Sequence, residues 1–429
     1  MSSSDPTGAL EAVGNPGFRF PAFPAPIRLG LRAWELAARL GIGRPDFSED
    51  KLIAQARRNT GLHHFGGQDF RLPMRRLLHS LEEEADLHLL GRSVMRTAVL
   101  RALECRLRLE NLCDLHPEIA GQPIERPVFI TGMQRTGTTK LHRLLSCAPE
   151  LRHLSAVEAL RPTPLGRPIR DEPGDWERRV RQAWIAEQGM KYMSPALFAI
   201  HPIEAESPEE DVFLFDATFI SPAVDASLSV PTYTKWIREI DQRLPYEYVR
   251  RLIQLLLWQK PGRYLGKTPH YQENLDVLLE VFPGAKIIHT HRDPLKVVPS
   301  FASMMTHTGA MLASEVDPRE VGRRVADQMV NSVERAIASR AEVLEGSILD
   351  VHYESLVKDP MAQMARIYDF LELEWSDEAI SNMRRWIAGN PQHKYGIHRY
   401  GLEDFGLDPE ELDARFKGYR ERFGVEREK

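Results

Sequence analysis

The sequence predicts an α/β protein, in which a phosphate-loop-like parallel sheet is flanked by helices and preceded by a helical N-terminal extension. After about residue 123, short β-branched runs alternate with stretches long enough for a helix. Before it, Leu, Val and Ala recur at three- and four-residue intervals, as they do on the apolar face of a helix. Residues 128–145 also read as a strand, a glycine-containing turn and a helix.

Composition narrows the class of protein. The chain has 429 residues, of which 42% are hydrophobic and 27% charged, which is typical of a soluble globular protein. Its 56 basic and 61 acidic side chains give a net charge of −5, so nothing global favours nucleic acid or a membrane surface as partner. Three cysteines are too few for a disulfide framework, and no leader or membrane span stands out. We therefore expect a cytoplasmic protein.

Three segments are expected along the chain. Residues 1–28 contain Gly, Ser and several prolines and predict an irregular arm. Residues 29–122 form the helical extension, with clear helical periodicity in residues 29–41 and 81–116. Residues 123–429 form the α/β domain, whose strands are expected in four runs: RPVFITG, RYLGK, AKIIHTHR and SILDVHYESL.

The first strand leads into a phosphate-loop-like motif. The strand Val128–Thr131 runs into Gly132, and Gly137 follows after four residues, just before a helix expected near Lys140. Such spacing lets backbone N–H groups and a helix N-terminus converge on an anion. The usual template, G-x-x-x-x-G-K-[ST], has a lysine where Thr138 stands here, while Arg135 supplies a charge from inside the loop.

The missing lysine indicates which group is transferred. In nucleoside triphosphate hydrolysis, the lysine and a magnesium ion neutralise charge on the phosphates. A sulfuryl group carries less negative charge than a phosphoryl group, so its transfer needs less cationic help and no obligatory metal. The glycines alone are equally compatible with an ordinary strand-to-helix connection.

A second strand also ends in charge. Ile287–His291 is the expected strand, and Arg292 follows at its carboxyl end. Asp293 and Pro294 are suited to the N-cap and first position of a helix, which places Ser300 two turns in. Because α/β sheets bind ligands at the carboxyl ends of parallel strands, Arg292 and the first loop should open on one crevice.

Together these motifs resemble the sulfotransferase family. GMQRTGTT is similar to that family's 5′-phosphosulfate loop, and Arg292 followed eight residues later by Ser300 matches its 3′-phosphate element. Tyr353–Pro360 is similar to a segment that the family places beside the adenine, and HRYGLEDFGLDPEELDARFKGYRERF is typical of its bacterial branch. The resemblance covers residues 65–425. It implies transfer of a sulfuryl group from 3′-phosphoadenosine 5′-phosphosulfate (PAPS) to a hydroxyl, less commonly an amine.

The resemblance also assigns binding roles to residues. The 5′-phosphosulfate would be held by the loop residues Arg135, Thr136, Gly137, Thr138 and Thr139. The 3′-phosphate would be held by Arg292 and Ser300, and Tyr353 would lie on the adenine side. A late basic segment would close over the donor with Lys394, His398 and Arg399.

The acceptor hydroxyl must lose a proton, which requires a general base. GKTPHYQENLD offers Lys267, expected to stabilise the leaving oxygen, and His270 as the base, although the family's histidine often sits at the position of Tyr271. The acidic run HPIEAESPEED offers Glu209 and Glu210 instead. An alternative is that Ser207-Pro208-Glu209-Glu210 is only a helix capping box, like the Asp-Pro starts at 317 and 408.

Other residues have plainer interpretations. His289 and His291 share a strand face but lack a third ligand at a helpful spacing, so packing or hydrogen bonding is favoured over a metal. Residues 212–220 and 231–236 are apolar and aromatic enough to wall a pocket for a small, apolar acceptor.

Two other functions are compatible with parts of the pattern. A phosphate-loop kinase or nucleotidase would leave Arg292 unexplained and lacks the loop lysine. A non-catalytic module would keep the nucleotide site and use the N-terminal helices to recruit a partner. A small-molecule acceptor and no nucleic acid are the expected partners, and a homo-oligomer is compatible with the sequence.

Overall fold

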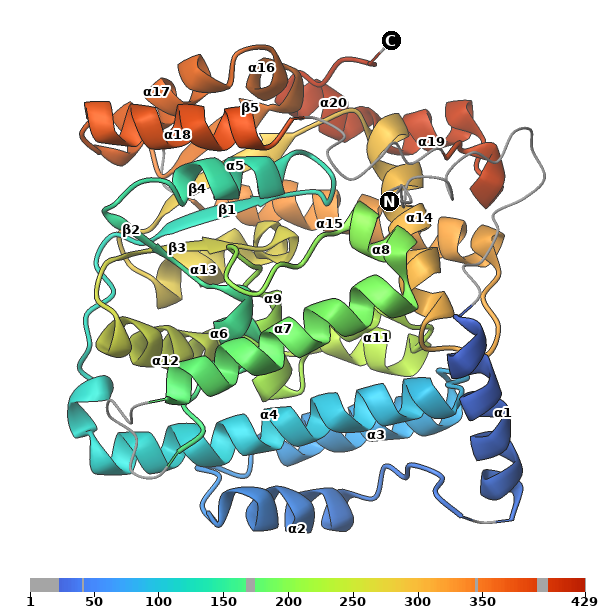
Figure 1. The fold of residues 1–429 in the computed structure, drawn as a ribbon. Helices are drawn as coiled ribbons and strands as arrows, with labels where there is room; N and C mark the ends of the chain where they lie inside the picture. The colour runs from blue at the N-terminus through green and yellow to red at the C-terminus, as the bar shows by residue number, and fades with distance from the viewer. Residues whose placement is uncertain (1–22, 41, 167–173, 344–345, 392–399, 429) are drawn as a thin grey trace, which may run out of the picture.

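A parallel five-stranded sheet forms the centre of the protein. The computed structural model describes residues 23–40, 42–166, 174–343, 346–391 and 400–428. The strands lie in the order β2-β3-β1-β4-β5, and each pairs with its neighbours in parallel (Figure 1). Their bounds are β1 (Val128–Gly132), β2 (Leu151–His153), β3 (Arg263–Lys267), β4 (Lys286–His291) and β5 (Ile348–His352). The four expected strands are confirmed, and β2 was not anticipated because three residues show no periodicity.

Helices cover both faces of the sheet. Successive residues of β1 point to opposite faces, so Val128 and Ile130 pack toward α5, α17 and α18, whereas Phe129 packs toward α12 and α13. The bounds of these helices are α5 (Thr138–Leu145), α12 (Arg243–Gln259), α13 (Leu275–Val281), α17 (Pro360–Leu371) and α18 (Asp377–Gly389). Because both faces are covered, every residue of the central strand β1 is buried.

The N-terminal extension is helical, as expected. Its helices are α1 (Ala25–Arg39), α2 (Glu49–Thr60), α3 (Arg71–Glu83) and α4 (Leu89–Leu115). Helix α1 begins at Ala25, inside the stretch expected to be an irregular arm, and Pro26 suits the first turn of a helix. The helical pattern of residues 81–116 is divided between α3 and α4, because Asp86 has a left-handed φ of 42° and Leu87 bridges to Ala313. Helices α2–α4 form a core of their own with residues of the 219–240 region.

The longest connection between strands joins β2 to β3 and builds the lower half of the α/β domain in Figure 1. Before α12, it contains α6 (Ala156–Leu160), α7 (Asp175–Met193), α8 (Pro195–Ile200), α9 (Val212–Phe215), α10 (Pro222–Ser227) and α11 (Pro231–Glu239). The other helices are α14 (Pro294–Ala310), α15 (Pro318–Ala341), α16 (Tyr353–Lys358), α19 (Pro409–Arg415) and α20 (Lys417–Phe423). Short 3-10 helices lie at Pro117–Ile119, Asp216–Thr218, Pro269–Asn274 and Glu403–Phe405.

Aspartates cap several of these helices. Asp293 accepts a hydrogen bond from the backbone N–H of Leu295, which confirms the expected start of α14. Asp317 and Asp408 cap α15 and α19 in the same way, as their Asp-Pro sequences predict. Within the described residues, no helix has the length and apolar character needed to cross a bilayer.

Candidate active site

The loop between β1 and α5 depends on two glycines. Gly137 has a φ of 90°, and a Cβ there would lie 2.9 Å from Cδ2 of Tyr353. A Cβ on Gly132, whose φ is 132°, would lie 2.4 Å from the carbonyl oxygen of Thr290. Helix α5 begins at Thr138, two residues earlier than expected. The loop therefore has the tight strand-to-helix geometry that its spacing predicts.

One threonine of the loop uses its hydroxyl for hydrogen bonds within the protein. The Thr136 hydroxyl donates to the carbonyl oxygen of Met133 at 2.6 Å and lies 2.6 Å from the hydroxyl of Thr290 on β4. Its side chain is fully buried. Thr138 and Thr139 stand in the first turn of α5, where backbone N–H groups lack partners within the helix. These N–H groups, rather than the Thr136 hydroxyl, are placed to bind an anion.

Arg135 joins the loop to α14. Its Nε donates to the Ser300 hydroxyl at 3.1 Å, and its Nη1 donates to the carbonyl of Ile200 at 3.3 Å. Its φ of 67° is in the left-handed region, which non-glycine residues adopt at some energetic cost. Burial lowers the pKa of this guanidinium, and no carboxylate in the described residues forms an ion pair with it. Even a partly buried cation is unfavourable without an anion, so the site fits a bound anion.

Arg292 brings a second positive charge beside Arg135. Its Nη1 donates to the carbonyl oxygen of Arg135 at 3.1 Å. Its guanidinium carbon lies 3.8 Å from the centre of the Tyr353 ring, in a cation–π contact. The two elements expected to bind anions therefore adjoin each other, and Ser300 and Tyr353 lie beside them.

Arg292 already forms an ion pair with the carboxylate of Glu428. Oε1 and Oε2 of Glu428 lie 2.8 and 3.1 Å from Nε and Nη2 of Arg292, a two-point contact. The backbone N–H of Glu428 donates to Asp293 at 2.8 Å, and Asp293 also pairs with Arg420 of α20. Sequence reasoning missed Glu428, because a lone glutamate far along the chain carries no motif. Its contact shows where an anion fits against Arg292.

Lys267 lies at the carboxyl end of β3, beside the loop. Its side chain is buried, and its ammonium pairs with the carboxylate of Glu210. Burial opposes the ionisation of Glu210, but Lys267 and His201 outweigh it and hold the pKa of Glu210 below its ordinary value. Glu210 is therefore an ionised partner of Lys267, and one member of the acidic run is at the site.

Glu209 and His201 stand behind this pair. Oε1 of Glu209 accepts the backbone N–H of Glu210 at 2.8 Å and lies 3.9 Å from Nε2 of His201. Burial lowers the pKa of His201. Ligand atoms of His201, Glu209 and Glu210 come within 4.8 Å of one another, but the Lys267 ammonium on Glu210 would repel a metal ion. His201 is the first residue of the acidic run HPIEAESPEED. Nothing else in the sequence indicated that it would lie at this site.

The capping-box interpretation of Ser207–Glu210 is wrong. No helix begins there, since α9 starts at Val212. The Ser207 hydroxyl donates to the carbonyl of Glu204 at 2.8 Å, and Pro208 bridges to Ser155. The backbone N–H of Glu209 instead donates a hydrogen bond to the carbonyl oxygen of Leu154 at 2.8 Å. A capping box does occur, between Ser155 and Glu158 at the start of α6.

Asp211 fixes the acidic run to the sheet. Its carboxylate accepts hydrogen bonds from the hydroxyls of Tyr264 and Tyr271, both at 2.8 Å, and its N–H donates to the carbonyl of Lys267 at 2.9 Å. Tyr271 is fully buried against Phe129, so its side chain belongs to the core and not to the crevice. The position that the family often gives to histidine is structural here, which leaves His270 as the histidine beside the loop.

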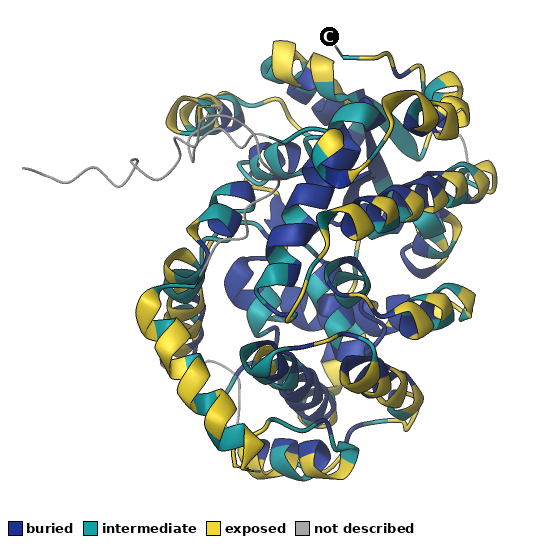
Figure 2. Cartoon of the chain, turned by 90° about the vertical axis from the view of Figure 1, so that its right-hand side faces the viewer, coloured by how far each residue is buried: buried dark blue, intermediate teal, exposed yellow. Residues whose placement is uncertain are grey.

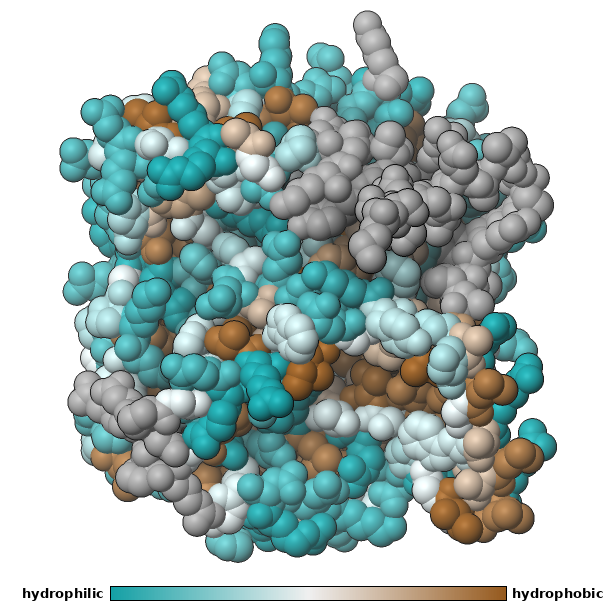
Figure 3. Space-filling model, viewed as in Figure 1, coloured by the Kyte–Doolittle hydropathy of each residue, from teal (hydrophilic) through white to brown (hydrophobic). Residues whose placement is uncertain are grey.

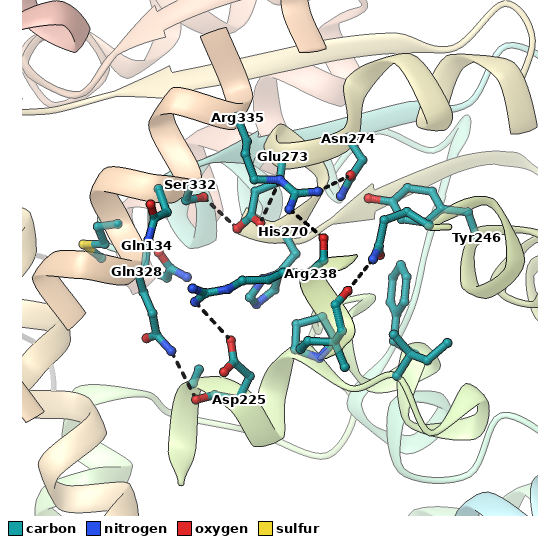
Figure 4. Close-up of a pocket in the computed structure, with 18 of the residues that line it drawn as sticks. Gln134, Asp225, Arg238, Tyr246, His270, Glu273, Asn274, Gln328, Ser332 and Arg335 are labelled. Carbon is teal, nitrogen blue, oxygen red and sulfur yellow. Dashed lines mark hydrogen bonds and ion pairs between the residues drawn. The ribbon is translucent and has the colours of Figure 1, made fainter. Parts of the chain in front are cut away.

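His270 and loop residue Gln134 line one pocket (Figure 4). Its apolar wall includes Phe215, Ile220, Ile237, Phe301 and Met329. Its polar wall contains two pairs of opposite charges, Arg238 with Asp225 at 3.8 Å and Arg335 with Glu273 at 3.9 Å, together with the side chains of Gln242, Asn274, Gln328, Asn331 and Ser332. Residues 212–220 contribute to the apolar wall as expected, but residues 231–236 do not line this pocket.

The histidines of β4 have a third neighbour after all. Nε2 of His291 lies 2.8 Å from Oδ1 of Asp350, and ligand atoms of these two residues and His289 lie within 4.8 Å of one another. However, Arg340 binds both oxygens of Asp350, each at 2.6 Å, and His291 stacks on Phe423. Packing and hydrogen bonding therefore account for this cluster. Lys394, His398 and Arg399 lie outside the described residues.

Comparison with known proteins agrees with this geometry. The profile of the sulfotransferase family matches residues 127–377, which contain the loop, Lys267, Arg292 and Tyr353. The chain belongs to the sulfotransferase family. Sulfotransferase STF1 of Mycobacterium tuberculosis H37Rv is 30% identical, with a TM-score of 0.76 over 88% of this chain and 100% of that structure. Sulfotransferase STF9 of Mycobacterium avium is 27% identical, with a TM-score of 0.78 over 88% and 97% of the two chains.

A curated relative has a named substrate. Omega-hydroxy-beta-dihydromenaquinone-9 sulfotransferase Stf3 of Mycobacterium tuberculosis is 24% identical over 280 residues, which are 62% of this chain and 68% of that protein. These similarities agree with the resemblance to bacterial sulfotransferases that the motifs predicted.

Asp211 predicts a pH dependence of stability. Burial raises its pKa to about 7, against the opposing effect of the two tyrosine hydroxyls. The folded protein therefore retains this proton up to about pH 7, whereas an unfolded aspartate releases it near pH ~4. Between these values the free energy of unfolding should fall as pH rises, by up to about 4 kcal/mol from this group. When the free energy of unfolding is measured by chemical denaturation, Asp211→Asn should remove this part of its decrease with pH. Asp276→Asn, at an exposed position of α13, should not. Identical pH profiles for Asp211→Asn and the unaltered protein would contradict the assignment.

Proposed function

We propose that this sulfotransferase transfers the sulfuryl group of PAPS to the hydroxyl, or less commonly an amine, of a small acceptor that has an apolar part. The observation that carries the proposal is that the two arginines adjoin each other. Arg135 contacts Ser300 at 3.1 Å while its own carbonyl accepts from Arg292 at 3.1 Å. One ligand with anionic groups at both ends of an adenosine would satisfy both arginines.

The donor would span the crevice. Its 5′-phosphosulfate would lie against the loop, where Arg135 and the N–H groups of residues 137–139 converge. Its 3′-phosphate would accept hydrogen bonds from Nε and Nη2 of Arg292, with Ser300 nearby. These are the two atoms that now donate to the Glu428 carboxylate. Tyr353, which packs on both Gly137 and Arg292, would flank the adenosine. Lys394 and Arg399, which are not among the described residues, would close over the donor.

The transfer is an in-line displacement at sulfur. The acceptor oxygen forms a bond to sulfur as the bond from sulfur to the bridging phosphate oxygen breaks, and adenosine 3′,5′-bisphosphate (PAP) leaves with that electron pair. Lys267 would stabilise the charge that develops on the bridging oxygen. Its pairing with Glu210 fixes its position before the donor arrives. Since a sulfuryl group brings little negative charge, this scheme uses no metal.

His270 is better suited than either glutamate to take the acceptor proton. It faces the pocket beside Gln134, where an acceptor would approach the loop (Figure 4). Glu210 is the alternative, but it is already paired with Lys267 and its lowered pKa makes it a weaker base. Glu209 is less suited, because it is 4% exposed and hydrogen-bonds the backbone of Glu210.

The pocket supports an amphiphilic acceptor. One wall is apolar, whereas the charges on the other are neutralised in pairs, so that wall offers hydrogen bonds without a net charge. The name of the relative Stf3 specifies a hydroxylated dihydromenaquinone. A hydroxyl on a largely apolar, uncharged molecule agrees with both observations, and a panel of such alcohols is the first screen.

Arg292→Ala should remove the preference for a 3′-phosphate. Calorimetry with PAP and with AMP should show tighter binding of PAP to the unaltered protein. Loss of a charged two-point contact should weaken PAP by about 10- to 100-fold and leave AMP nearly unchanged. Ser300→Ala, which keeps the cation, should have a smaller effect. An unchanged ratio of PAP to AMP affinity in Arg292→Ala would contradict the placement of the 3′-phosphate.

Glu428→Gln should have the opposite effect. An uncharged side chain competes less well for Arg292, so PAP should bind more tightly, by roughly tenfold, with no change for AMP. Glu426→Gln is the matched control, because Glu426 is exposed and only two residues away. Equal PAP affinity in the two variants would show that the 3′-phosphate does not replace the Glu428 carboxylate.

The pH dependence of turnover should identify the base. With PAPS and the best substrate from a panel of alcohols that includes farnesol, His270→Asn should reduce kcat by about 10²- to 10⁴-fold and abolish the acidic limb of kcat/KM. PAP affinity should be unaffected. Glu210→Gln should also slow turnover, because it frees Lys267, but should retain the acidic limb. The reverse pattern would assign the base to Glu210.

A further inference from the structure

Helix α1 has two apolar faces, and only one of them meets the part of the protein that the structure describes. The inward face presents Ile27, Leu31 and Trp34, which are partly buried. The Trp34 indole N–H donates to the carbonyl of Gly43 at 2.8 Å, and α1 packs against α4. These contacts fix which side of the helix points away from the protein.

The outward face of α1 and the turn after it are unusually apolar. Leu29, Leu36, Leu40 and Ile42 are 66, 63, 79 and 63% exposed, and they are the four most exposed large hydrophobic side chains of the described chain. Leu29, Leu36 and Leu40 are spaced by seven and four residues, which places them on one stripe of the helix. Figure 3 shows apolar side chains gathered at the lower right, where Figure 1 places α1. Figure 2 faces that side of the molecule and shows a helix without a buried residue along the lower left. Such a surface usually has an occupant.

A row of arginines runs beside the leucines. Arg28, Arg32 and Arg39 are exposed and lie on one flank of the stripe, at spacings of four and seven residues. Glu35 is the only acidic residue of α1. The helix therefore combines a leucine face with a basic flank, although the whole chain has a net charge of −5.

We propose that this face of α1 rests on an anionic lipid bilayer. Leucines beside a row of arginines are the pattern of interfacial helices, in which apolar side chains enter the headgroup region and basic ones meet lipid phosphates. A second copy of the chain is a poorer occupant, because pairing α1 with itself would bring the arginine rows of two copies together. The helix would lie along the membrane surface, since at 15 residues it is too short to span the bilayer.

Vesicle flotation of the full chain tests this proposal. The protein should float with vesicles of phosphatidylglycerol and phosphatidylcholine, and far less with phosphatidylcholine alone. Leu29→Glu combined with Leu36→Glu should reduce binding at least about tenfold. Arg32→Gln combined with Arg39→Gln should weaken binding to the anionic vesicles and reduce its salt sensitivity. The matched control is Leu72→Glu combined with Leu244→Glu, whose leucines are 55 and 57% exposed on other helices.

Each outcome decides the proposal. Failure of the unaltered protein to float with anionic vesicles overturns it, as does equal binding by the two leucine double variants. Light scattering that shows a dimer which Leu29→Glu with Leu36→Glu converts to a monomer would assign the face to a second copy. PAP affinity, measured in parallel, should be unchanged in all three double variants and shows that a loss of flotation is not a loss of folding.

Discussion

The partly buried guanidinium of Arg135 is the constraint around which the site is organised. It has no carboxylate partner in the described chain, and its hydrogen bonds go to a serine of α14 and to a backbone carbonyl. Placing a cation there is unfavourable unless an anion joins it. The left-handed φ of Arg135 and the crowded glycines of the loop are further costs of this geometry. All three become understandable if the crevice exists to bind an anionic ligand.

The neighbouring charges follow from the same requirement. Arg292 is held in place by Tyr353 and by the carboxylate of Glu428, which the 3′-phosphate would replace under the proposed function. Lys267, by contrast, keeps a permanent partner in Glu210. Among the described residues, Arg135 thus has no carboxylate partner, whereas Arg292 and Lys267 each pair with a glutamate. Under the proposed function, a nucleotide with two anionic ends would bind the two arginines.

Sequence alone predicts the parts of this arrangement that are local. The four main strands, the loop and the aspartate caps follow from periodicity and turn chemistry within a few residues, and all are confirmed. Contacts between residues that are far apart in the sequence could not be predicted from it. Glu428 contacts Arg292 from 136 positions away, and Ser207 obeys a capping pattern that tertiary pairing with the segment before α6 overrides. The polar wall of the pocket was missed for the same reason, because α11 and α15 bring its charges together only after folding.

The most direct test is a crystal structure of the protein with PAP. We predict that the 5′-phosphate lies against residues 132–139, that the 3′-phosphate binds Arg292 beside Ser300, and that the Glu428 carboxylate has left Arg292. A nucleotide in another cavity would contradict it. So would a 3′-phosphate turned to solvent while Glu428 still holds Arg292, because the two arginines would then not serve one ligand.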